Sequence, residues 1–130
     1  MNFKELKALN LIDNSILFIK VLEKVKFEKL EKLYLIYNNI SNLNFLENAN
    51  FKELKELDLS ENTISDIKVL EKVKFDKLEI LNFSHNEISD INNLENANFK
   101  KLKELNLSSN KISDIKVLEK VKFDILKNYI

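Results

Sequence analysis

The chain contains no Cys, Gly, Pro, Trp or Arg. Without Cys it has no disulfides and no thiolate metal sites, and a single His cannot build a conventional zinc cluster. Its 21 basic residues, all of them Lys, balance 21 acidic residues. Recognition of phosphates and bases relies on the planar guanidinium of Arg, so this composition argues against a nucleic-acid partner. We therefore expect no metal, no cofactor and no nucleic acid.

Long apolar runs are also missing. No segment approaches the ~20 apolar residues that a membrane helix needs. The N-terminus leads at once into a polar and apolar repeat, without an apolar signal segment. These features predict no membrane association and a cytoplasmic location.

The lack of Gly affects the turns. Turns that need a positive φ usually use Gly, and Asn is the residue that most readily replaces it. Asn is abundant in this chain. We therefore expect Asn at several of these turns.

What the chain does have is a strict period of 24 residues, marked by a recurring Phe. The Phe residues are Phe3, Phe27, Phe51, Phe75, Phe99 and Phe123. Such self-similarity indicates a repeat protein in which each unit packs on its neighbours. Each unit is called a coil here, and its Phe is position one.

Within each full coil, Leu occupies positions four and seven, Leu or Phe position nine, Asn position twelve and Ile position fourteen. Positions seven to nine alternate apolar, polar and apolar residues, which predicts one short parallel strand per coil with one buried face. The position-twelve residues are Asn14, Asn38, Asn62, Asn86 and Asn110. Buried turn amides need partners, and these Asn side chains can supply them.

The pattern Leu-x-x-Leu-x-Leu-x-x-Asn-x-Ile resembles the leucine-rich repeat family over essentially the whole chain. The segment Asn-x-Ile-Ser-x-Ile-x-x-Leu-Glu looks like the bacterial internalins and the phosphatase-regulator type. The resemblance implies an α/β solenoid shaped like a horseshoe, with a concave parallel β-sheet and short helical or 3-10 returns on the convex side. It also implies that the position-twelve Asn points inward and bonds the turn.

We expect one domain over residues 1–130. Its repeats are 3–26, 27–50, 51–74, 75–98 and 99–122, followed by a partial repeat, 123–130.

Two further patterns concern the outer side of each coil. Ser65, Ser89 and Ser113 precede the expected returns and are predicted to be N-caps, each followed by an Asp in the first turn. Charges alternate in sign from coil to coil at several positions, and position five reads Lys7, Glu31, Lys55, Glu79 and Lys103. Neighbouring strands lie ~4.8 Å apart, so these side chains are expected to pair across coils.

In the resembled family, positions six, eight, ten, eleven and thirteen project from the concave sheet. These positions vary between coils, whereas the scaffold positions barely change. The first two coils place aromatic and aliphatic residues there, and the next two place acidic residues with one His. We predict a partner-binding surface composed of Ile12, Tyr34, Ile36, Tyr37, Glu56, Asp58, Glu61 and His85.

This surface predicts a non-catalytic module that binds a protein partner. His85 beside Glu61 could act as a general base, but no nucleophile with a third orienting group is evident, so we expect no enzyme.

The alternative is a purely structural segment of a longer or engineered repeat array without a dedicated ligand. The first coil has no polar cap and the sequence stops within a sixth coil, so self-association through uncapped ends is expected. The C-terminal residues predicted to mediate it are Phe123, Leu126, Tyr129 and Ile130.

Overall fold

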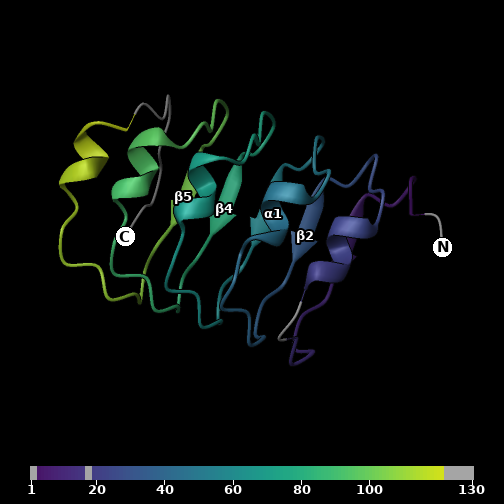
Figure 1. Ribbon diagram of the computed structural model, residues 1–130, viewed down its shortest axis with the longest axis horizontal. Coiled ribbons are helices and arrows are strands. Elements are labelled where there is room, and N and C mark those ends of the chain that lie inside the picture. Colours follow the sequence, from purple (N-terminus) through teal and green to yellow (C-terminus); the bar gives the residue numbers. More distant parts are fainter. Residues whose placement is uncertain (1–2, 17–18, 122–130) are drawn as a thin grey trace.

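The computed structural model describes residues 3–16 and 19–121, which form five coils stacked side by side (Figure 1). Each coil contributes one strand and one short helical return, and the strands and returns form two stacked layers. In chain order the elements are β1 (Ala8–Asn10), η1 (Lys20–Lys24), β2 (Lys32–Tyr34), α1 (Phe45–Asn48), β3 (Glu56–Asp58), η2 (Lys68–Glu71), β4 (Ile80–Asn82), η3 (Asn92–Asn96), β5 (Glu104–Asn106) and η4 (Lys116–Glu119).

The sheet has the order β1-β2-β3-β4-β5, and its strands are parallel. Each residue pairs with its equivalent in the next coil, as Leu33 does with Leu57 and Leu57 with Leu81. The predicted parallel strand per coil is thereby confirmed. Because the register follows the repeat, each repeat position forms a row across the sheet.

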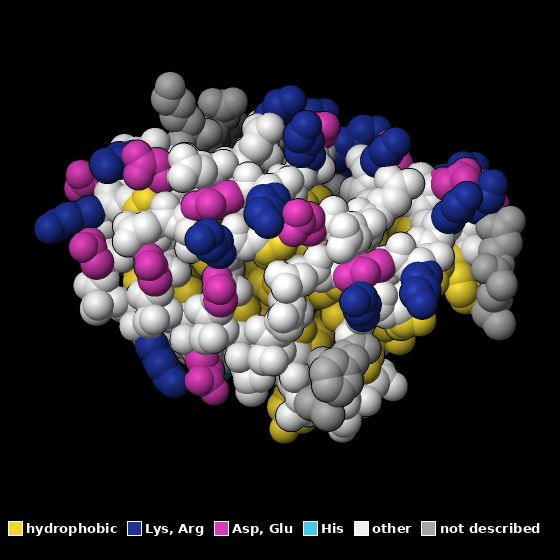
Figure 2. All heavy atoms as spheres, in the orientation of Figure 1, with side chains coloured by type: hydrophobic (Ala, Val, Ile, Leu, Met, Phe, Trp, Pro, Cys, Tyr) yellow, Lys and Arg dark blue, Asp and Glu magenta, His cyan; other side chains and the backbone are white. Residues whose placement is uncertain are grey.

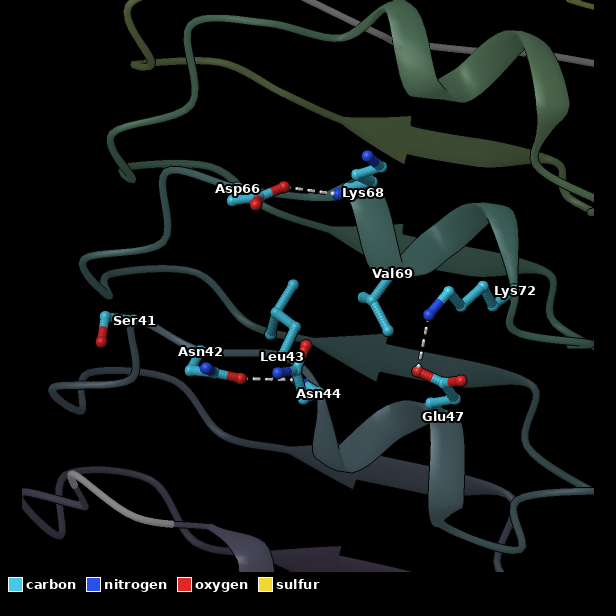
Figure 3. Close-up of a pocket in the computed structure, with 9 residues that line it drawn as sticks. All are labelled: Ser41, Asn42, Leu43, Asn44, Glu47, Asp66, Lys68, Val69 and Lys72. Atoms are coloured by element: carbon cyan, nitrogen blue, oxygen red, sulfur yellow. Dashed lines mark hydrogen bonds and ion pairs between the residues drawn. The ribbon is translucent and has the colours of Figure 1, made fainter.

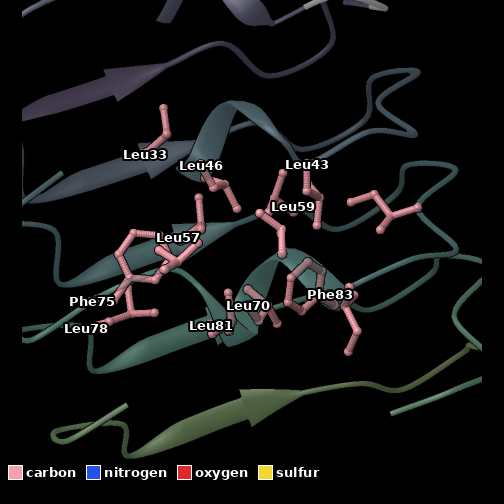
Figure 4. Close-up of a cluster of buried hydrophobic side chains, with 14 of the residues drawn as sticks. Leu33, Leu43, Leu46, Leu57, Leu59, Leu70, Phe75, Leu78, Leu81 and Phe83 are labelled. Carbon is pink, nitrogen blue, oxygen red and sulfur yellow. The ribbon is translucent and has the colours of Figure 1, made fainter. Parts of the chain in front are cut away.

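The core lies between the sheet and the returns. The position-seven residues Leu33, Leu57 and Leu81 are fully buried, and so are Leu59 and Phe83 at position nine (Figure 4). Burying such a side chain contributes about 1.5–3 kcal/mol. The predicted alternation of buried and exposed side chains along each strand is correct.

The recurring Phe residues form a spine along the stack, and ring contacts join three of the four successive pairs within the described residues. Ring centroids lie 6.1 Å apart for Phe3 and Phe27, 6.0 Å for Phe27 and Phe51, and 6.3 Å for Phe75 and Phe99. These distances suit offset aromatic packing. The spine holds successive coils together at the end of the sheet where each strand begins.

The predicted Ser N-caps are wrong. The first residue of η2 is Lys68, three residues after Ser65, and the residue at its N-cap position, Ile67, makes no side-chain capping bond. The Oδ1 atom of Asp66 instead accepts the N–H of Lys68 at 2.7 Å, and Asp90 and Asp114 make the equivalent bonds. Because the chain between the Ser and the 3-10 helix is not helical, the Ser hydroxyl does not meet the first amides of the helix.

Ion pairs confirm the predicted pairing of alternating charges. Lys55 Nζ lies 2.9 Å from Glu31 Oε2, and Lys103 Nζ lies 2.7 Å from Glu79 Oε2. Position three supplies two more pairs, Lys29 with Glu5 and Lys77 with Glu53. Each pair joins neighbouring coils, so charge complements the spine in fixing the stack. The residues predicted to mediate self-association, from Phe123 onward, lie outside the described residues.

Candidate protein-binding face

The concave face rests on a ladder of Asn side chains. Asn62 is buried, and its Nδ2 donates to the carbonyl oxygens of Leu35, Leu59 and Ser60 at 3.0–3.1 Å. Its Oδ1 accepts the N–H of Ile40, which belongs to the preceding coil, at 3.0 Å. Asn38, Asn86 and Asn110 make corresponding bonds. The inward Asn expected from the family resemblance is therefore present.

Asn14 is the exception in this ladder. Its side chain is exposed and donates to the carbonyl oxygen of Ile12 at 2.8 Å. The bonds that bury its equivalents reach back to the strand of the preceding coil, and the strand of its own coil, β1, is the first in the described part of the sheet. Asn14 therefore differs from the four later Asn residues in environment, although the sequence pattern is the same.

The apolar part of the predicted surface is accessible. Tyr37 is 62% exposed and Ile12 39% exposed, whereas Tyr34 and Ile36 are half-buried. Leu33 and Leu35 beneath them have no exposed surface. The strand register thus places Tyr34 outward, as the sequence predicts. We call Ile12, Tyr34, Ile36 and Tyr37 the apolar patch.

Position eleven has a left-handed backbone in every coil. The φ angles lie between 54° and 57° at Asp13, Tyr37, Glu61, His85 and Ser109. Such angles are uncommon outside Gly and Asn, so the expectation that Asn occupies the turns needing a positive φ is wrong. In each coil the ladder Asn comes one residue later and bonds the turn with its side chain. The residue before it takes the strained conformation.

The acidic part of the surface is partly committed to internal bonds. Asp58 Oδ1 accepts from the backbone N–H of Ser60 at 2.9 Å and from its hydroxyl at 2.6 Å, while Asp58 Oδ2 accepts from Asn82 Nδ2 at 3.0 Å. Ser60 and Ser84, at position ten of their coils, are buried. Each lies beside the position-eight side chain of its own coil, which accepts its backbone N–H, and Asp58 also accepts the Ser60 hydroxyl.

Glu56 and Tyr34 belong to one polar group at the edge of the apolar patch. Lys32 Nζ lies 3.2 Å from Glu56 Oε2. Burial raises the pKa of Tyr34, and hydrogen bonding to the Glu56 carboxylate raises it further. Hydrogen bonding to the same carboxylate raises the pKa of Lys32. The phenol of Tyr34 therefore stays protonated at neutral pH and can donate a hydrogen bond.

His85 and Glu61 are brought together as expected. His85 Nδ1 lies 3.8 Å from Glu61 Oε1, and both side chains are exposed. Both residues occupy position eleven of adjacent coils. This separation fits a solvent-exposed contact between coils, and it holds the two groups on the acidic side of the apolar patch.

A cleft of about 360 Å³ lies on the convex side, between the returns of coils two and three (Figure 3). Two acidic and two basic side chains line it, and Lys72 Nζ lies 3.4 Å from Glu47 Oε2. Asn42 and Asp66 use their Oδ1 atoms to accept backbone N–H groups nearby. In the orientation of Figure 1 the surface mixes Lys and acidic side chains (Figure 2). Balanced charge and internal bonding make the cleft a weaker candidate than the concave face.

Within residues 3–16 and 19–121 no cluster of His, Asp or Glu is suited to hold a metal ion. No helix in the described part of the chain is long and apolar enough to cross a membrane.

Comparisons with known proteins agree with this architecture. A family model described as leucine-rich repeats in two copies matches residues 28–72, 52–96 and 76–120. The structure is similar to that of internalin C2 from Listeria monocytogenes, with a TM-score of 0.76 and 28% identity, covering 98% of this chain and 53% of that one. It is also similar to an internalin, InlF, from the same organism, with a TM-score of 0.56, 25% identity and coverages of 97% and 48%. The chain thus spans about half the length of these two structures. A search of curated proteins gave no significant match.

Proposed function

Because the chain belongs to the leucine-rich repeat family, we propose that it is a non-catalytic protein-interaction module that binds a partner protein through its concave face. The main observation in support of this proposal is the exposed apolar patch on the concave sheet. Tyr37 is 62% exposed while the Leu residues directly beneath the patch are fully buried. Exposed Tyr side chains are favoured anchors at protein interfaces, because they bury a large area at little entropic cost.

The rigidity of the scaffold supports the same role. The Asn ladder and the in-register strands fix the backbone under positions eight to eleven, so the side chains there are presented in a set geometry. A preorganised surface loses less conformational entropy when it binds. The acidic residues Glu56, Asp58 and Glu61, together with His85, would then form the second half of the interface.

Photo-cross-linking tests the location of this surface. One variant carries p-benzoylphenylalanine in place of Tyr37, and its control carries the same group in place of Val21, which lies on the convex return and is 64% exposed. Irradiation in a cell extract is expected to give a discrete protein adduct from position 37 and none from position 21.

Equal adduct patterns from both positions would contradict the proposed face. No adduct from either position would favour the alternative, a structural segment of a longer repeat array without a dedicated ligand. The cytoplasmic location and the self-association expected from the sequence stay predictions.

A further inference from the structure

One backbone N–H on the concave face differs from its equivalents in the other coils. In four coils the side-chain oxygen at position eight accepts the N–H at position ten. These bonds are Ile12 N to Asn10 Oδ1 at 3.0 Å, Ser60 N to Asp58 Oδ1 at 2.9 Å, Ser84 N to Asn82 Oδ1 at 2.9 Å and Ser108 N to Asn106 Oδ1 at 3.0 Å. The bond satisfies a donor that the sheet itself does not use.

The second coil breaks this row. Its position-eight residue is Tyr34, whose phenol oxygen is too far from its backbone to accept the N–H two residues on. The N–H of Ile36 consequently has no acceptor among the residues that the structure describes. A backbone donor without a partner is costly when covered by an apolar surface, so any ligand over the patch has to satisfy it.

Its surroundings restrict the ligand further. Ile36 lies within the apolar patch, so an acceptor that reaches its N–H also brings neighbouring groups against Ile12, Tyr34 and Tyr37. A peptide main chain meets both needs, because it has a carbonyl oxygen beside each side chain.

Charge supplies the third constraint. The concave positions hold six acidic residues, Asp13, Glu56, Asp58, Glu61, Glu87 and Glu104, against two basic ones, Lys32 and Lys111, a net charge of −4 on one face of a chain whose total is zero. Both Lys residues are already paired, with Glu56 and Glu87 at 3.2 Å. The potential over the face is therefore negative and attracts cationic partners.

We propose that the concave face binds a partner segment that presents an apolar side chain flanked by Lys or Arg, with a main-chain carbonyl oxygen of that segment accepting the N–H of Ile36. This inference rests on the proposed function and specifies the chemistry of its partner.

Two synthetic peptides test the proposal. The first has a central Leu-Phe pair with two Lys residues on each side; the second replaces each Lys with Glu, and both have blocked ends. Titration into the ¹⁵N-labelled full chain is followed by NMR. The Lys-flanked peptide is expected to bind at least about tenfold more tightly. The ratio between the affinities of the Lys-flanked and Glu-flanked peptides should decrease in high salt. Binding of the Lys-flanked peptide should also shift the Ile36 amide proton downfield.

Tyr34→Asn is the diagnostic variant. It removes an aromatic side chain and restores the acceptor found in the other four coils, so the fold is expected to stay intact while affinity for the Lys-flanked peptide falls by about tenfold or more. Val21→Asn, an equally polar change on the convex side, is expected to leave the affinity unchanged.

Three results would overturn the proposal: no binding of the Lys-flanked peptide, equal binding of the Glu-flanked peptide, or unchanged affinity of Tyr34→Asn. If cross-linking from position 37 still captures a partner in that case, the concave interface stands and only its cationic and carbonyl chemistry is wrong. If both experiments fail, the proposed function fails with it.

Discussion

At the scale of single residues, the position-twelve Asn side chains are the most heavily bonded polar groups of the scaffold. Asn62 joins two coils through four hydrogen bonds to backbone groups. We expect Asn62→Ala to lower the free energy of unfolding by about 1–3 kcal/mol, because buried backbone groups lose their partners. Urea unfolding measures this change.

Asn14→Ala is the matched control, since Asn14 is exposed and its side chain bonds one carbonyl oxygen. Its effect should stay below about 0.5 kcal/mol. An equal loss of unfolding free energy in both variants would show that the hydrogen bonds from Asn62 to the preceding coil contribute nothing to stability.

Position eleven offers a gain in stability. Ser109 has a φ of 54°, a region that Asn adopts more readily than Ser. Ser109→Asn should raise the free energy of unfolding by about 0.5–1 kcal/mol, whereas Ser113→Asn, at an exposed site without a positive φ, should not. Thermal unfolding decides the matter, and a loss at Ser109 would mean that its side chain has a role beyond the turn.

The residue scale also shows where the sequence could not predict the structure. The inward Asn could be predicted because it recurs in a fixed relation to the Leu pattern. The left-handed position could not, because Asp, Tyr, Glu, His and Ser share it and none of them signals a positive φ. The unpaired N–H of Ile36 was also missed, although one signal existed: Tyr34 stands where the other four coils have Asn or Asp.

At the scale of elements, coils are tied by charge as well as by strands. Hydrogen bonding and attraction to Lys103 lower the pKa of Glu79 below its usual 4.5. A carboxylate with a lowered pKa stabilises the fold above its unfolded pKa, and this contribution is lost as the pH falls through its folded pKa. The melting temperature of the unmodified chain should therefore exceed that of Glu79→Gln near neutral pH, and the gap should close below about pH 4.

The control for this prediction is Glu119→Gln, since no ion pair to Glu119 is present in the described part of the chain. It should show no such pH-dependent gap. If the difference in melting temperature between the unmodified chain and Glu79→Gln persists at low pH, the contact between Glu79 and Lys103 does not stabilise the fold through charge.

The strands and the ion pairs could be predicted from the sequence because both depend on a simple alternation, with period two along a strand and opposite charges in neighbouring coils. The hydrogen bonds at the N-termini of the returns could not be predicted. Ser and Asp are both good caps, and only the point where the helix begins decides between them; Lys68 begins η2 two residues after Asp66.

At the scale of the whole molecule, repetition made the fold predictable. One unit of 24 residues specifies the sheet, the core and the spine, and stacking repeats them. Binding specificity cannot follow from repetition, since it lies in the positions that differ between coils. The alternation along the strands was enough to assign the apolar patch to the concave face, but the repeat pattern does not specify which partner binds there.

Hydrogen–deuterium exchange with the captured partner tests the central claim, that the concave face is the binding surface, most directly. Binding is predicted to slow exchange at residues 34–37 and 58–61, including the Ile36 amide, and to leave the returns η1 and η2 unchanged. Slower exchange confined to η1, α1 and η2, with the strands unaffected, would contradict it and place the partner on the convex side.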